Sequence, residues 1–235
     1  MKETGAKKTL EEARSKYFQR EFRAFMRKAH GFDDEDFAAA ALVLKEMVLS
    51  APEKSPRVML DRILSDFAPH WTKPSFPSNA DWHHFLVPGV IVCALRNCGY
   101  VIRDEDIAEA MSRGEKLLGG SCGFAGACGG AYGVGIVLSI ARKLTPIHDI
   151  ERSETMLAVS ETLRAIAAYP RRCCKRSSYT AIQVAVHELR RLGYERLDAG
   201  AGECRWHSQN KMCYGARCPF YPPGRDAGAG YGETV

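Results

Sequence analysis

Residues 117–141 read LLGGSCGFAGACGGAYGVGIVLSIA and contain no charged side chain. A stretch of this length could cross a bilayer, which takes roughly 20 apolar residues. However, it holds eight glycines and two cysteines, and its continuously apolar part is confined to residues 134–141, where Gly135 and Ser139 still interrupt it. We therefore interpret it as a buried glycine-rich turn that leads into a core helix, and we expect no membrane segment.

The sequence around this stretch is typical of amphipathic helices joined by short loops. Apolar side chains recur every three or four residues, and Asp, Ser, Thr or Pro often stands where a helix would begin. This pattern predicts helices over Thr9–Ala29, Asp33–Leu49, Pro56–Phe67, Trp82–Asn97, Arg103–Leu118, Tyr132–Lys143, Ile150–Ala168 and Ser177–Leu192. No strand-like alternation is convincing, so the predicted fold is mainly α, a helical domain with a glycine-cysteine loop and an irregular, Cys-rich C-terminal tail.

A proline-rich segment at residues 68–79 suggests a boundary between two parts of the chain. We predict an N-terminal helical segment over residues 1–67, a Cys-rich helical core domain over residues 80–220 and a flexible tail over residues 221–235.

Composition points to a globular protein with reduced thiols. The 235 residues are 46% hydrophobic and 26% charged, with nine cysteines and a net charge of +5. The first 30 residues lack the apolar stretch of an export signal, so we expect a cytoplasmic protein. They also hold nine Lys or Arg against four Asp or Glu. This basic helix is either a solvated face or a docking site for a protein partner, and we do not expect nucleic acid to bind.

The cysteines form four groups along the chain. Cys93 and Cys98 lie on an apolar helix and are expected in the core. Cys122 and Cys128 lie in the glycine loop, where backbone N–H groups can approach a metal-bound thiolate. Tight packing around small residues is the alternative reading of that loop.

Cys173 and Cys174 stand among four cations, which favour the thiolate form. Adjacent cysteines rarely bind one metal together, so we expect one ligand and one neighbour. A basic helix start with incidental cysteines is the alternative. The hypothesis is that Cys122, Cys128 and one of this pair converge on one metal site.

The tail contains Cys204, His207, Cys213 and Cys218, with Pro219 after the last cysteine. A segment with so little apolar content needs a covalent or metal constraint to stay ordered, so we expect its three cysteines to lie close together. The four side chains could bind zinc, although the spacing is not that of a zinc finger. The cysteines could instead act as further ligands to the central cluster.

Five other side chains are candidates for substrate binding. Arg176 comes first, because it precedes a predicted helix start and a guanidinium suits a carboxylate or phosphate. Arg172 is second, and Ser121 neighbours Cys122 in the glycine loop. His83 and His84 are adjacent, so they point about 100° apart on a helix and at most one faces a given site. No catalytic residue is assigned.

Four segments carry a resemblance to known families: residues 82–99 (WHHFLVPGVIVCALRNCG), residues 113–136 (RGEKLLGGSCGFAGACGGAYGVGI), residues 169–182 (YPRRCCKRSSYTAI) and the three-cysteine tail. Together they resemble an uncharacterised cysteine-rich family, a domain of unknown function from anaerobic archaea and bacteria. The glycine-flanked Cys122 and the later Pro-x-x-Cys before a helix are also similar to the α-domain of iron–sulfur L-serine dehydratases and cysteine desulfidases.

The second resemblance implies an iron–sulfur cluster of the [4Fe–4S] type, bound in part by Cys122 and by Cys173 or Cys174, with one open iron. Ser177 stands where those families carry an asparagine. The expected function is therefore an iron–sulfur lyase or desulfidase that acts on a small anionic substrate through the open iron. The alternatives are a zinc- or cluster-stabilised binding module, and an electron carrier whose cluster is fully bound by cysteine.

Overall fold

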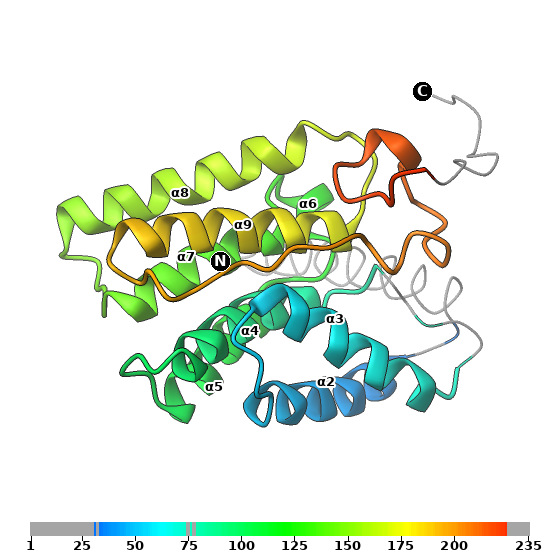
Figure 1. Ribbon diagram of the computed structural model, residues 1–235, viewed down its shortest axis with the longest axis horizontal. Helices are drawn as coiled ribbons and strands as arrows, with labels where there is room; N and C mark the ends of the chain where they lie inside the picture. Colours follow the sequence, from blue (N-terminus) through cyan, green and yellow to red (C-terminus); the bar gives the residue numbers. More distant parts are fainter. Residues whose placement is uncertain (1–30, 32, 74–75, 77–78, 225–235) are drawn as a thin grey trace, which may run out of the picture.

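The computed structural model describes residues 31, 33–73, 76 and 79–224, which form eight α-helices and two short 3-10 helices (Figure 1). The α-helices are α2 (Asp34–Leu49), α3 (Pro56–Phe67), α4 (His83–Asn97), α5 (Asp104–Glu115), α6 (Ser121–Phe124), α7 (Gly129–Ala141), α8 (Asp149–Ala167) and α9 (Cys174–Arg191). The 3-10 helices are η1 (Ala68–His70) and η2 (Gly215–Arg217). No strand occurs among these residues, which confirms the all-helical fold. The helix expected over Thr9–Ala29 and residues 225–235 lie outside the described part.

Helix starts follow local capping chemistry. The Asp33 side chain accepts hydrogen bonds from the backbone N–H groups of Glu35 and Asp36, and so caps α2. Ser55 caps α3 in the same way, with Pro56 at the first helical position, where no N–H partner is needed.

Helix α4 is the centre of the molecule. All its residues from His83 to Leu95 are buried, and it packs against α2, α3, α5, α7 and α9. Figure 1 shows α7, α8 and α9 grouped on one side and α2, α3, α4 and α5 on the other. One hydrophobic core joins the two groups and extends from Ala40 to Phe220.

After α9 the chain returns along that helix, between α9 and α3 (Figure 1). Ala199 O accepts hydrogen bonds from Arg57 N (3.2 Å) and from Ser55 Oγ (3.1 Å), which fixes the returning segment to the start of α3. Residues 203–224 then form an irregular tail, which the return path brings back to the end of the molecule where α9 begins.

None of the described helices is long and apolar enough to span a bilayer. In the uncharged stretch, α7 is 13 residues long, and it packs against α4, α8 and α9. This agrees with the expectation of a core helix preceded by a glycine-rich turn.

Candidate functional site

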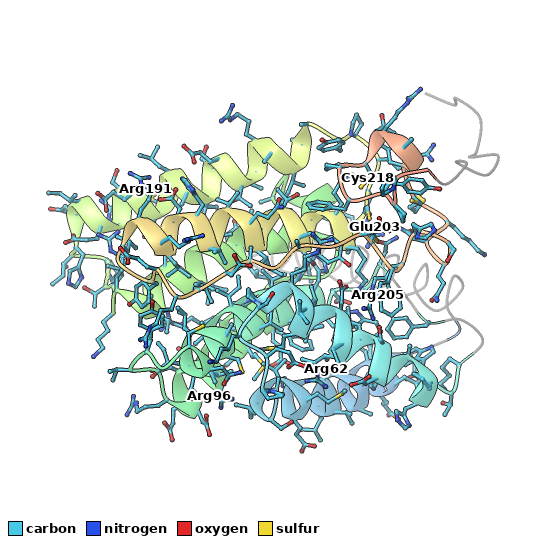
Figure 2. All side chains as sticks on the ribbon, viewed as in Figure 1. Arg62, Arg96, Arg191, Glu203, Arg205 and Cys218 are labelled. Atoms are coloured by element: carbon cyan, nitrogen blue, oxygen red, sulfur yellow. The ribbon has the colours of Figure 1, made fainter. Side chains whose placement is uncertain are left out.

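Four thiols from distant parts of the chain line one cavity. Cys173 is the N-cap residue of α9, and Cys204, Cys213 and Cys218 come from the tail. The cavity contains about 300 Å³ of space, its open side included. Its other lining residues are Arg176, Tyr179, His207, Asn210, Tyr214, Phe220 and Tyr221. Figure 2 shows Cys218 at the α9 start, with Glu203 and Arg205 at the same end and Arg191 at the other.

Backbone N–H groups point at three of these sulfurs. Cys173 Sγ accepts hydrogen bonds from Arg176 N (3.4 Å) and from the side chain of Asn210 (3.3 Å). The Cys204 thiol accepts a hydrogen bond from the backbone N–H of Trp206, and the Cys218 thiol accepts one from the backbone N–H of Phe220. Such donors stabilise a thiolate, and they are a usual feature of thiolate-ligated metal sites.

Burial favours the neutral form of three of these thiols. Burial raises the pKa of Cys173 and Cys218, and it raises the pKa of Cys204 to about 11, with a further contribution from the charge of Cys173. A bound metal ion would reverse this preference, because a coordinating thiol is deprotonated outright.

Arg176 places a buried positive charge beside the thiols. Its side chain is 3% exposed, and its Nη2 donates to the carbonyl oxygens of Tyr169 (3.2 Å) and Arg171. Its side chain also forms a hydrogen bond with the Cys218 thiol, while its Nε and Nη1 atoms are left without a partner among the described residues. The residues that line the cavity include no Asp or Glu. A buried cation with free donors and no lining carboxylate fits an anionic group within the cavity.

Cys174 faces a different environment from its neighbour Cys173. Its backbone N–H donates to Asn79 Oδ1 (2.8 Å), and its Sγ lies 3.9 Å from Arg172 Nη2. Burial raises the pKa of the Cys174 thiol. Asn79 also donates to Asn210 Oδ1 (2.7 Å), and so links this environment to the four-thiol cavity.

A second reactive group lies at the start of α7. Cys128 is the N-cap residue of this helix, and its thiol is hydrogen-bonded to the imidazole of His83 and to the side chain of Ser177. His83 Nδ1 lies 2.6 Å from Ala80 O. Burial alone raises the pKa of Cys128, but the hydrogen bond and charge of His83 outweigh it, so the pKa is lower than that of an ordinary thiol.

The other candidates lie apart from the four-thiol cavity, whose lining includes neither Cys122 nor Cys128. Cys122 is exposed on α6, and Ser121 is buried, with no partner for its hydroxyl among the residues that the structure describes. His84 packs against Gly129, where an added Cβ would lie 2.5 Å from the His84 ring carbon Cγ. Cys93 and Cys98 are buried in the core, as expected.

The sequence placed two helix starts too late. Helix α7 begins at Gly129 and not at Tyr132, and α9 begins at Cys174 and not at Ser177. Cys128 and Cys173 therefore become N-cap residues. The Cys173 sulfur accepts the N–H of Arg176, and the Cys128 sulfur interacts with the N–H of Gly130. Sequence reasoning also missed Asn210 and Tyr179, because no local motif marks either residue.

A family profile described as DUF5714, a family of unknown function, matches residues 44–221. This range includes the four cavity cysteines as well as His83 and Cys128. Comparisons with curated proteins and with solved structures gave no match.

Proposed function

The chain belongs to the DUF5714 family of unknown function, and we propose that it is an iron–sulfur protein whose cluster is bound by Cys173, Cys204, Cys213 and Cys218. The observation that carries this proposal is the shared cavity, which four thiols and the buried guanidinium of Arg176 line together. Soft thiolate donors select iron–sulfur clusters or zinc over hard cations.

The arrangement of the thiols favours a cluster over a single ion. Within the described residues, no three His, Cys, Asp or Glu side chains are grouped so that they could hold one metal ion. The four thiols instead surround a cavity. Sulfurs that bind a four-iron cluster lie roughly 6–7 Å apart, given metal–sulfur bonds of about 2.3 Å, and so need a cavity between them.

Charge supports the same assignment. Four thiolates exceed the positive charge of a four-iron core, so the bound group is an anion in a mostly buried site. The free Nε and Nη1 donors of Arg176 and the N–H groups of Trp206 and Phe220 are suited to stabilise it. A bound cluster would supply one-electron redox chemistry, with its potential set by these donors and by exposure.

Four thiols are enough to ligate every iron of such a cluster. Full ligation by cysteine supports electron transfer as the function, in preference to elimination or desulfuration of a small anionic substrate at an open iron. If one of the four cysteines proves unnecessary for cluster binding, one iron would be open. A lyase or desulfidase function would then be favoured, with Arg176 as the group that binds the substrate anion.

The second candidate is a structural zinc ion in the same cavity, for which the tail would have to close further on the thiols, since no three ligands are grouped for one ion among the described residues. It is favoured by His207, which lines the cavity with the cysteines, and by the irregular tail, which a zinc ion would anchor to the start of α9.

Metal and sulfide analysis of anaerobically purified protein tests these proposals. We expect about four iron and four sulfide per chain, with visible absorption that bleaches on reduction. Cys204→Ser and Cys218→Ser should lose most of the iron while far-UV circular dichroism stays unchanged. Cys98→Ser is the matched control, because the Cys98 thiol is buried and donates only to the carbonyls of Lys54 and Arg196.

One zinc and no sulfide per chain would establish the second candidate instead. Full iron content in the Cys204→Ser, Cys218→Ser double variant would show that the cluster is bound elsewhere. Iron retained in one of the four single cavity variants would identify a three-thiolate cluster with an open iron.

A further inference from the structure

We propose that Cys128 and His83 form a thiol-based catalytic site, distinct from the four-thiol cavity, that transfers an acyl group from a small activated ester or thioester. The proposal rests on a nucleophile, a base and amide donors that α4, α7 and α9 bring together.

A nucleophile and a base are paired at the start of α7. The Cys128 thiol is hydrogen-bonded to the His83 imidazole. His83 Nδ1 lies 2.6 Å from Ala80 O, and since a carbonyl only accepts, Nδ1 carries the proton. Nε2 is therefore the nitrogen that faces the thiol and can take its proton. A nucleophile, a base and a third group that orients the base are the general arrangement of covalent catalysis.

The start of α7 also offers amide donors for the oxyanion that develops during acyl transfer. Cys128 is the N-cap of a 13-residue helix, and the backbone N–H of Gly130 is hydrogen-bonded to its sulfur. The N–H of Gly129 belongs to the same first turn, whose amides have no partner within the helix. Glycine is required at Gly129, where an added Cβ would collide with the His84 ring. The Ser177 side chain, also hydrogen-bonded to Cys128, adds a further polar group. Helix-terminal amides aimed at a reacting carbonyl oxygen are suited to acyl transfer.

The reaction transfers the acyl group to the Cys128 sulfur. Cys128 Sγ passes its proton to His83 Nε2 and forms a bond to the acyl carbon, whose carbonyl electron pair moves to oxygen near the Gly129 and Gly130 amides. The carbonyl re-forms, the bond to the leaving alcohol or thiol breaks, and His83 returns the proton to the leaving group. The product is an S-acyl Cys128, which a water or acceptor nucleophile then releases, with His83 again as the base.

Two other roles for Cys128 fit the surroundings less well. A metal site would need further ligands, and no group of three His, Cys, Asp or Glu placed for a metal occurs in the described part of the chain. The second role is a disulfide, and Cys128 forms none, because it is a free cysteine. Its residue keeps 9% exposure, and residues 122–126, which precede it in the chain, are exposed.

The test is acylation of the full-length protein, purified anaerobically with its metal content recorded, by p-nitrophenyl acetate. We expect a burst of one p-nitrophenolate per chain and one acetyl group on Cys128 in the peptide map. Cys128→Ser should abolish the burst. His83→Asn, whose amide can still donate to Ala80 O, should slow acetylation at least about 10-fold. Cys98→Ser should react like the wild type.

The proposal is overturned if the acetyl group is found on Cys122 or spread over several thiols with Cys128 unmodified, or if His83→Asn reacts at the wild-type rate. Iron content separates this result from the metal proposal. If Cys128→Ser loses the iron, Cys128 is a metal ligand and the acyl-transfer site is wrong. If the iron is kept in all variants, the acylation result stands independently of how the cluster is used.

Discussion

At the scale of single residues, the two adjacent cysteines at the start of α9 show how position sets chemistry. Cys173 lines the four-thiol cavity and accepts hydrogen bonds from Arg176 N and Asn210. Cys174 lies near Arg172, outside that lining. Because Cys173 is the N-cap and has an extended backbone while Cys174 is helical, the two side chains leave the chain in different directions, and one metal group is expected to bind only Cys173.

His84 gives a pH prediction at the same scale. Burial is the largest cause that lowers its pKa from 6.5 to about 3. The folded state therefore binds fewer protons than the unfolded state, so the stabilisation is complete above pH 6.5 and is lost as the pH falls toward 3. We expect the free energy of unfolding to fall by up to about 1.4 kcal/mol per pH unit between pH 6 and pH 4. Urea denaturation at several pH values measures this slope.

The matched variants are His84→Asn and His187→Asn. His187 is a mostly exposed residue of α9, so its replacement should leave the slope unchanged. His84→Asn should flatten the slope, whatever it does to stability at pH 7. Equal slopes in His84→Asn and in the wild type would show that His84 is not the group responsible.

At the scale of helices, α4 and α5 approach each other closely at Gly114. A Cβ added at Gly114 would lie 2.7 Å from Phe85 Cα and 2.8 Å from His84 C, which are backbone atoms that cannot rotate away. The absence of a side chain at Gly114 therefore lets α5 lie directly against the first turn of α4, the turn that carries His83.

Gly114→Ala should be strongly destabilising for this reason. We expect a loss of about 2–3 kcal/mol in the free energy of unfolding, since overpacking against fixed backbone forces the helices apart. The control is Gly123→Ala on α6, where an added Cβ meets no atom within 4 Å and the backbone needs no positive φ. Gly123→Ala should change stability by less than about 0.5 kcal/mol. A similar small change for both variants would contradict the close α4–α5 contact.

Most helices could be predicted from the sequence because their signals are local. The spacing of apolar residues and the caps Asp33 and Ser55 predict α2 and α3 within one residue of their observed bounds. The starts of α7 and α9 were missed, because Gly-Gly and Cys-Cys are not typical first residues of a helix. Their helical conformation depends on packing, as at Gly130, whose added Cβ would lie 3.3 Å from Ser177 O.

At the scale of the whole molecule, the grouping of the thiols could not be predicted. The sequence indicated that Cys173, Cys204, Cys213 and Cys218 are suited to bind metal, but their meeting depends on the return of the tail along α9. That path is held by contacts between distant residues, such as those of Ser55 and Arg57 with Ala199 and Gly202. The pairing of His83 with Cys128 likewise needs α4 and α7 to be packed together, and no sequence spacing encodes it.

A buried charge network connects these distant parts. Asp61 on α3 accepts hydrogen bonds from the hydroxyl of Tyr179 on α9 (2.5 Å) and from Trp206 Nε1 in the tail (3.4 Å). Lys175 is 2% exposed and lies over the Trp206 ring, and it interacts with the charge of Asp61. Burial raises the pKa of Asp61, against the charges of Arg57 and Lys175, and it lowers the pKa of Lys175, against the charges of Cys174 and Asp61.

Removing the carboxylate should therefore destabilise the fold and release the tail together. Asp61→Ala removes the acceptor of the buried Tyr179 hydroxyl and of Trp206 Nε1, together with the negative charge that acts on Arg57 and Lys175. We expect a loss of about 3 kcal/mol in the free energy of unfolding, measured in urea at pH 7. Asp66→Ala is the control on the same helix, because the Asp66 side chain is 51% exposed and forms a surface ion pair with Arg62, which should be worth less than about 1 kcal/mol. Since Trp206 follows Cys204 by two residues, Asp61→Ala should also lower the iron content, whereas Asp66→Ala should not. Equal effects of the two variants would show that α3 does not hold the tail in place through Asp61.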